Sequence, residues 1–205
     1  MPSPTTTTPV EDTGFDPLVF WIQHKSKIIL FTGLIVGALV IYGIAEYVSQ
    51  KRAAAAQVLY SNAKTADDFR KVVSEYGGTV PGGNAELMLA EKLRAAGKLD
   101  DSSAALHAFI DKYPEHPLIS GAYTSLATNL ETQGKIDEAL AMYQKVSSAY
   151  ANSFSAPLAL LAQGRLLAQK GKAEDARRIY EQVMTQYQDN VASQFASQEI
   201  RKLKK

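Results

Sequence analysis

The side chains that could support catalysis or bind a metal are few and widely spaced in this sequence. Its three histidines, His24, His107 and His116, include no pair four residues apart, the spacing that lets one helix face bind zinc. The 205 residues contain no cysteine, which excludes thiolate nucleophiles, disulfides and cysteine-ligated metals. Neither a GxSxG nucleophile elbow nor a GxxxxGK[ST] phosphate loop occurs. We therefore predict no enzyme activity, no metal site and no cofactor.

Adjacent acidic residues are the one recurrent motif that could suggest metal binding or acid–base chemistry. They occur at Asp67–Asp68, Asp100–Asp101, Asp137–Glu138 and Glu174–Asp175. Each pair falls where a helix is predicted to begin, and an acidic side chain there stabilises the positive end of the helix dipole. We therefore interpret these pairs as helix caps.

The charge balance excludes further classes of partner. Lys and Arg number 22 against 21 Asp and Glu, so the formal net charge is +1. Nucleic-acid-binding domains usually carry a strongly basic stripe, so we predict no nucleic-acid partner, and no small-molecule substrate is indicated either. Hydrophobic residues make up 46% of the chain and charged residues 21%, which is typical of a folded protein.

The N-terminal quarter divides by composition into three predicted segments. Residues 1–16 are rich in Pro and Thr and predict a disordered tail. Asp16 and Pro17 then resemble a helix N-cap and first helical residue, which opens a short interfacial helix over 17–27. The following 28–48 begins with 18 uncharged residues, enough for about 27 Å of helix and a single crossing of a bilayer.

Two alternatives to an uncleaved membrane span remain open for this apolar stretch: a buried core helix and a cleaved signal peptide. Its orientation is also open, because Lys25 and Lys27 precede it while Lys51 and Arg52 follow it. Gly33 and Gly37 form a GxxxG step, so they are candidates for close packing with another membrane helix, including a second copy of this chain.

A register of 37 residues runs through the rest of the sequence. Gly97, Gly134 and Gly171 recur at this interval, each between two apolar-periodic segments. Other columns of the same register are Leu106, Tyr143 and Tyr180, and Tyr113, Tyr150 and Tyr187. Each copy predicts two antiparallel helices, with the glycine supplying a positive φ at the end of the first.

The register predicts how the chain is organised after the membrane span. Because the span and the repeats are both helical, we predict an all-α protein. We expect a helical continuation and a first atypical hairpin over 49–83, which ends in a glycine-rich loop at Gly77–Asn84. Three regular repeats follow at 84–116, 117–153 and 154–190, and a capping helix at 191–205. Stacked hairpins of this kind form a solenoid, because one hairpin cannot bury its apolar face alone.

The repeat pattern resembles tetratricopeptide repeats. The residues on that family's signature columns are Tyr123, Leu126, Ala127, Leu130, Gly134, Ile136, Ala139 and Tyr143, and then Leu160, Gly164, Leu167, Gly171, Ala176 and Tyr180. Ser102 and Gln163 depart from it, standing where alanine and leucine are usual.

The layout as a whole resembles the ancillary SecYEG translocon subunit family (YfgM-like proteins). That resemblance implies a single-pass bacterial inner-membrane protein, with a cytoplasmic N-terminus and periplasmic repeats. It implies as partners translocon subunits, a periplasmic chaperone or a client polypeptide emerging from the translocon. A scaffold for outer-envelope assembly or cell division has the same layout and remains the alternative, and an enzyme with an unrecognised site remains a third.

The family's geometry also implies which side chains face the concave side of the stack, since the first helix of each hairpin lines it. The candidate protein-binding residues are Leu87, Glu91, Arg94, Thr124, Thr128, Glu131, Leu161, Arg165 and Gln169. They mix apolar groups with both signs of charge. A surface of this composition suits an extended or helical protein segment held without a dominant charge contact.

Overall fold

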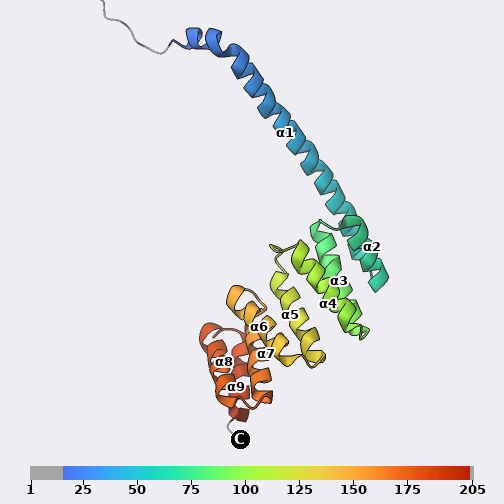
Figure 1. Cartoon of the computed structure of the whole chain (residues 1–205), viewed down its shortest axis with the longest axis vertical. Coiled ribbons are helices and arrows are strands. Elements are labelled where there is room, and N and C mark those ends of the chain that lie inside the picture. Colours follow the sequence, from blue (N-terminus) through green and yellow to red (C-terminus); the bar gives the residue numbers. More distant parts are fainter. Residues whose placement is uncertain (1–15, 204–205) are drawn as a thin grey trace, which may run out of the picture. The chain divides into compact units, whose positions relative to one another are not determined.

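A computed structural model of the chain describes residues 16–203, and its regular elements in that range are all α-helices (Figure 1). They are α1 (Pro17–Asn62), α2 (Ala66–Tyr76), α3 (Val80–Ala95), α4 (Leu99–Lys112), α5 (Ile119–Thr132), α6 (Ile136–Ala149), α7 (Ala156–Gln169), α8 (Ala173–Gln186) and α9 (Val191–Leu203). The all-α prediction is confirmed. The tail predicted over 1–16 lies outside the described residues except for Asp16, as do the last two residues of the predicted cap.

The first structural unit consists of the N-terminal part of α1, up to Gln50. The Asp16 carboxylate accepts hydrogen bonds from the amides of Leu18 and Val19, at 2.8 and 3.3 Å, which confirms it as the N-cap before Pro17. The predicted interfacial segment, the apolar stretch and the continuation from residue 49 all lie within this one 46-residue helix. No residue of the apolar stretch is buried within the described chain, which excludes a buried core helix, whereas a membrane span and a signal sequence both remain consistent with it.

The second unit, from Lys51 onward, is a stack of helical hairpins (Figure 1). Consecutive helices pack against one another from α2 to α9, and α9 also contacts α7. The last turns of α1 belong to this unit: Ala56 is fully buried, and the Arg52 guanidinium donates to the Glu75 carbonyl at 3.1 Å. At the other end, Ala192 and Ala196 of α9 pack against Leu160 and Tyr180. A short helix therefore covers the apolar side of the final hairpin.

The three glycines of the 37-residue register have the same backbone conformation, with φ of +75° at Gly97, +77° at Gly134 and +74° at Gly171. After each glycine, a lysine amide donates to a carbonyl five residues earlier, as Lys98 does to Leu93 at 2.9 Å. This is the hydrogen bond of a Schellman motif, which ends a helix with a left-handed residue. The same helix-ending geometry therefore recurs every 37 residues.

The glycine-rich loop expected at Gly77–Asn84 is shorter than predicted, because α3 already begins at Val80. The Thr79 hydroxyl caps this helix by accepting from the Gly82 amide at 3.1 Å. A Cβ on Gly82 would overlap the Tyr76 backbone, and one on Gly83 would lie 3.4 Å from the Phe109 and Tyr113 rings. These glycines therefore permit close packing within a helix, which composition alone does not distinguish from a flexible loop.

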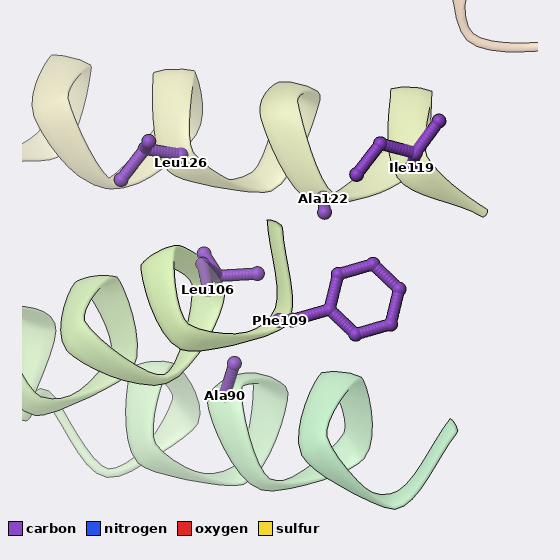
Figure 2. Packing of buried hydrophobic residues seen from close by; sticks show 6 residues of the cluster. All are labelled: Ala90, Leu106, Phe109, Ile119, Ala122 and Leu126. Atoms are coloured by element: carbon purple, nitrogen blue, oxygen red, sulfur yellow. The ribbon is translucent and has the colours of Figure 1, made fainter. Parts of the chain in front are cut away.

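The core is formed by side chains shared between neighbouring hairpins. Leu106 and Phe109 of α4 lie between Ala90 of α3 on one side and α5 on the other (Figure 2). The α5 contribution to this cluster is Ile119, Ala122 and Leu126. Because α4 buries residues against both neighbours, each hairpin depends on the next one to complete its core.

The acidic pairs lie in the first turns of α2, α4, α6 and α8, as predicted, but a hydrogen-bonded side-chain cap is found at only one of these helices. Asp68 does form a capping box with Thr65, but α4, α6 and α8 begin without a side-chain cap. Instead, Asp100 accepts from the Gln133 amide at 2.8 Å, and Asp137 forms an ion pair with Lys170. Each of these carboxylates reaches the C-terminal end of the first helix in the following hairpin, so the acidic residue joins adjacent repeats.

Candidate functional site

The first helices of the three regular hairpins, α3, α5 and α7, carry the nine candidate binding residues. The structure brings four of them together around one pocket with a volume of about 330 Å³ between α3 and α5: Leu87, Glu91, Arg94 and Thr124. We call this the α3–α5 pocket. Its other lining residues are Ala90, Ser102, Leu106, Leu118, Gly121, Ser125, Phe154, Ser155 and Leu158.

The rim of the α3–α5 pocket carries apolar side chains that are unusually accessible to solvent. Phe154 is 63% exposed, Leu158 53% and Leu118 38%. Sequence reasoning missed all three, because they lie in the connections before α5 and α7 or at the first turn of α7, outside the helix faces implied by the family. The one signal in the sequence was an isolated aromatic residue, Phe154, in an otherwise small and polar loop.

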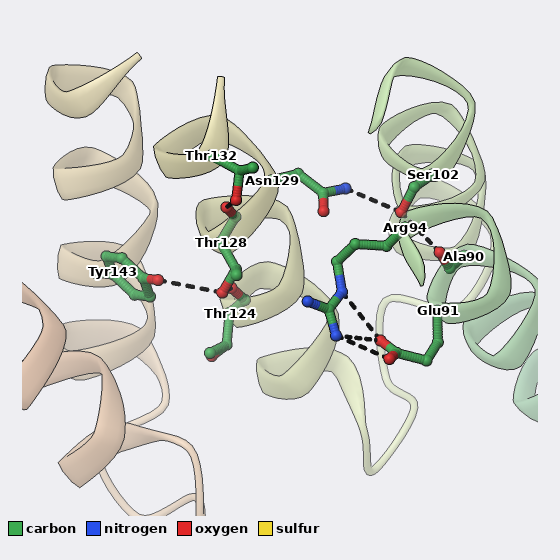
Figure 3. A network of polar contacts seen from close by, with 9 residues as sticks. All are labelled: Ala90, Glu91, Arg94, Ser102, Thr124, Thr128, Asn129, Thr132 and Tyr143. Atoms are coloured by element: carbon green, nitrogen blue, oxygen red, sulfur yellow. Dashed lines mark hydrogen bonds and ion pairs between the residues drawn. The ribbon is translucent and has the colours of Figure 1, made fainter. Parts of the chain in front are cut away.

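The charged residues of this pocket neutralise each other. Arg94 donates to both carboxylate oxygens of Glu91 on the same helix, at 2.7 to 3.1 Å (Figure 3). Both side chains are partly exposed, so the pair contributes little to stability, but it leaves no unmatched charge beside the pocket.

A second group of candidates lies between α5 and α7. Arg165 forms two hydrogen bonds to the carboxylate of Glu131, both at 2.8 Å. The Tyr143 hydroxyl lies 3.2 Å from that of Thr128 and donates to Glu131 at 3.4 Å. The hydrogen bonds from Arg165 hold the pKa of Glu131 below its usual value, whereas burial raises the pKa of Tyr143. At neutral pH the group therefore contains a carboxylate, a guanidinium and a protonated phenol.

A row of threonines on α5 connects the two groups. The hydroxyls of Thr124, Thr128 and Thr132 each donate to the carbonyl four residues earlier, at 2.8 to 3.0 Å. The bonds of Thr128 and Thr132 are drawn in Figure 3. Because each hydroxyl proton is used within the helix, the threonine oxygens offer lone pairs rather than protons to a ligand. The remaining two candidates lie elsewhere on α7: Leu161 is half-buried against the last core cluster, and Gln169 is exposed near the end of the helix.

Within residues 16–203, no three His, Asp or Glu side chains gather closely enough to hold a metal ion. His116 is buried against Phe109 and Tyr113, and its Nδ1 accepts from the Leu118 amide at 3.1 Å. Burial lowers the pKa of His116, so the ring is neutral and has a structural role in the connection between α4 and α5.

Gly33 and Gly37 lie on the exposed surface of the apolar part of α1. Nothing in the structure of the single chain occupies the step between them, so their role in helix packing stays a prediction.

Comparison with known proteins agrees with this architecture. A family model described as a tetratricopeptide repeat-like domain matches residues 19–205. No curated protein matches the sequence. Two solved structures of a protein of Podosopora anserina, described as a kinesin light chain with nearly identical TPR-like repeats, share 15% and 16% identity at a TM-score of 0.56. Each alignment covers 75% of this chain and 84% of that one.

A third solved structure, BtubC (BKLC) from P. vanneervenii, shares 18% identity at a TM-score of 0.50. It is covered over 57% of its length, and 69% of this chain takes part in the match. At these identities the similarity establishes the fold alone.

Proposed function

Because the chain belongs to the tetratricopeptide repeat-like family, we propose that it is a non-enzymatic, membrane-anchored protein-binding scaffold. The observation that carries this proposal is the presence, in one chain, of an exposed apolar helix and a hairpin stack with accessible apolar side chains around the α3–α5 pocket. Solitary surface hydrophobics are ordinary, but a cluster of them around a pocket is typical of an interaction site.

The proposal includes a location. The apolar part of α1 crosses the bacterial inner membrane once, with the N-terminus in the cytoplasm and the hairpin stack in the periplasm. Alkaline phosphatase fused after Lys205 is then active in a Gram-negative host, and a cytoplasmic reporter fused there is not. The opposite result reverses the topology. Recovery of the full-length mass from the membrane fraction distinguishes an anchor from a cleaved signal sequence, which would lose its N-terminal segment.

For the partner, we propose the Sec translocon and the periplasmic chaperones that act on emerging polypeptides. The support is the resemblance in layout described above, together with a binding surface in which the charges are paired. A photoreactive residue at Gln169, an exposed candidate, is expected to crosslink in native membranes to a translocon subunit, a chaperone or a secretory polypeptide. The same residue at the exposed Glu181 of α8 is the matched control. Crosslinks only to outer-envelope assembly or cell-division proteins would favour the alternative scaffold instead.

The ion pairs determine how the surface is best perturbed. Arg165→Glu alone would place two carboxylates together beside Glu131 and destabilise the contact between α5 and α7. The double variant Glu131→Arg with Arg165→Glu keeps an ion pair but reverses its direction across the surface. Loss of crosslinking in this double variant, with an unchanged melting temperature, is the result expected if this part of the surface contacts the partner.

A further inference from the structure

The α3–α5 pocket lies at a column of the register in which the first regular hairpin has a smaller side chain than the next two. Leu106 occupies the place that Tyr143 and Tyr180 take in the next two hairpins. The Tyr143 hydroxyl reaches Thr128 on α5, and the Tyr180 ring packs so closely on Gly164 of α7 that a Cβ there would overlap it. The corresponding Leu106 faces Ala90 (Figure 2) and carries neither a ring nor a hydroxyl. Leu106 is itself only 2% exposed, but it lines the α3–α5 pocket, so the first regular hairpin has a pocket at the column where the other two have a tyrosine.

We infer that the α3–α5 pocket binds one large uncharged side chain, of the phenylalanine or leucine class, from an extended polypeptide. The inference rests on the proposed function, from which it takes the polypeptide nature of the ligand. It adds the position and the chemistry of a single recognition site.

The size of the pocket fits this ligand. Its volume of about 330 Å³ is at the lower end of the range of roughly 300–1,000 Å³ for ligand pockets, and corresponds to on the order of ten waters of liquid. A whole helix does not fit in such a space, whereas one aromatic or branched aliphatic side chain fits together with its adjoining backbone. The exposed rim of Leu118, Phe154 and Leu158 would cover the neighbouring part of the bound chain.

The electrostatics select against charge. Glu91 and Arg94 are the only charged residues among those lining the pocket, and they are bound to each other. A charged group entering beside Ala90 and Leu106 would lose hydration without gaining a counter-ion. An uncharged apolar side chain, by contrast, gains from leaving water and disturbs no existing pair.

Gly121 provides a way to fill the pocket with little disturbance. It lies on α5 in the pocket wall, and an added Cβ would be at an ordinary 3.6 Å from the Phe154 ring, which is itself largely exposed. Gly121→Leu therefore places a leucine side chain where the ligand should bind. Gly121→Ala is the matched control, because it adds a methyl group to the same helix position and leaves most of the pocket open.

The test uses the full-length chain in lipid nanodiscs with ¹³C-labelled leucine methyl groups. N-acetyl-phenylalaninamide is the probe, and N-acetyl-glycinamide and N-acetyl-aspartate amide are the controls. We expect the probe alone to shift the methyl resonances of Leu106, Leu118 and Leu158 saturably. Gly121→Leu should weaken this binding by roughly 10- to 100-fold, the equivalent of burying one large apolar side chain, and Gly121→Ala should not.

Equal shifts with the glycine or aspartate amide, or unchanged binding in Gly121→Leu, would overturn the inference. A second variant, Phe154→Ser with Leu158→Ser, alters only exposed rim residues, so it should fold normally and also weaken binding of the probe. If Gly121→Leu does not fold, the rim variant decides. Full binding of the probe by Phe154→Ser with Leu158→Ser then counts against the pocket.

Reduced and carboxymethylated α-lactalbumin, an unfolded polypeptide, separates this inference from the proposed function. If the wild-type chain binds it and Gly121→Leu binds it equally well, the pocket is not the recognition site but the scaffold function stands. If the wild-type chain does not bind it, the proposal of polypeptide binding itself is contradicted.

Discussion

Tyr143 is the side chain whose removal should most clearly test how the hairpins hold together. It belongs to α6, is 3% exposed, and packs in one cluster with residues of α5 and α7. Its buried neighbours include Ala127, Ala139 and Ala159, whose short side chains are fixed directly to helix backbones. They cannot move into a vacated space unless a whole helix moves, so a cavity left by Tyr143→Ala should persist.

The size of the effect follows from this rigidity. Truncation of a buried aromatic residue costs about 3–5 kcal/mol, and a site that cannot collapse belongs in the upper part of that range. Tyr143→Phe keeps the ring and removes only the hydroxyl contacts to Thr128 and Glu131, at 3.2 and 3.4 Å. Because both contacts are long and the tyrosine hydroxyl is uncharged, their loss should cost only about 0.5–1.5 kcal/mol.

The assay is urea unfolding of the fragment Lys51–Lys205, followed by circular dichroism at 222 nm. This fragment keeps the last turns of α1, including the buried Ala56, and should be soluble and helical because the hairpins form their own core. Tyr150→Ala is the matched control, since Tyr150 ends the same helix and is only partly buried. A loss below about 1 kcal/mol in Tyr143→Ala, or an effect equal to that of Tyr150→Ala, would refute a rigid inter-hairpin core at this position.

Three further predictions concern single residues of the same unit. Gly134→Ala should destabilise the hairpin stack by about 1–2 kcal/mol, because φ is +77° at this position. Gly121→Ala on α5 should be neutral or stabilising in the same unfolding experiment. Glu86→Gln should raise the melting temperature at pH 7 but little at pH 4. Burial raises the pKa of Glu86, so the cost of its charge appears only as the pH rises above the carboxyl's ordinary value of 4.5. Asp137→Asn, measured against Asp101→Asn, should weaken the contact with Lys170 and reduce the salt dependence of stability, because salt screens an exposed ion pair. Equal salt dependence in the two variants would contradict a contribution from this pair.

The sequence predicted those features that depend on local chemistry. Glycine at Gly97, Gly134 and Gly171 is needed for a left-handed helix end, and all three take that conformation. Asp16 and Pro17 form a helix start that any chain with these two residues can adopt. Both features are determined by side chains within one turn, so they can be recognised without knowledge of the fold.

Features that depend on a neighbouring repeat could not be predicted in this way. A carboxylate such as Asp100 near a helix start can cap its own helix or reach across to another, and only the spacing between hairpins decides which. The rim of the α3–α5 pocket is of the same kind, since Phe154 and Leu106 are 48 positions apart in the chain yet line one space.

The two departures from the repeat pattern show why such contacts matter to a stack of similar units. Ser102, at the usual alanine position, is joined to Asn129 of α5 at 2.9 Å, and Gln163, at the usual leucine position, donates to Ser147 of α6 at 2.9 Å. Buried polar pairs are costly unless both partners meet, so each is satisfied only when the correct hairpins are adjacent. Since the two pairs lie at different interfaces and use different residues, a hairpin stacked out of order would bury the amides of Asn129 and Gln163 without these partners. The Ser102 hydroxyl would keep its hydrogen bond to the Ala90 carbonyl of its own hairpin. The apolar core stabilises any stacking of these hairpins, and the polar pairs favour the order found in the chain.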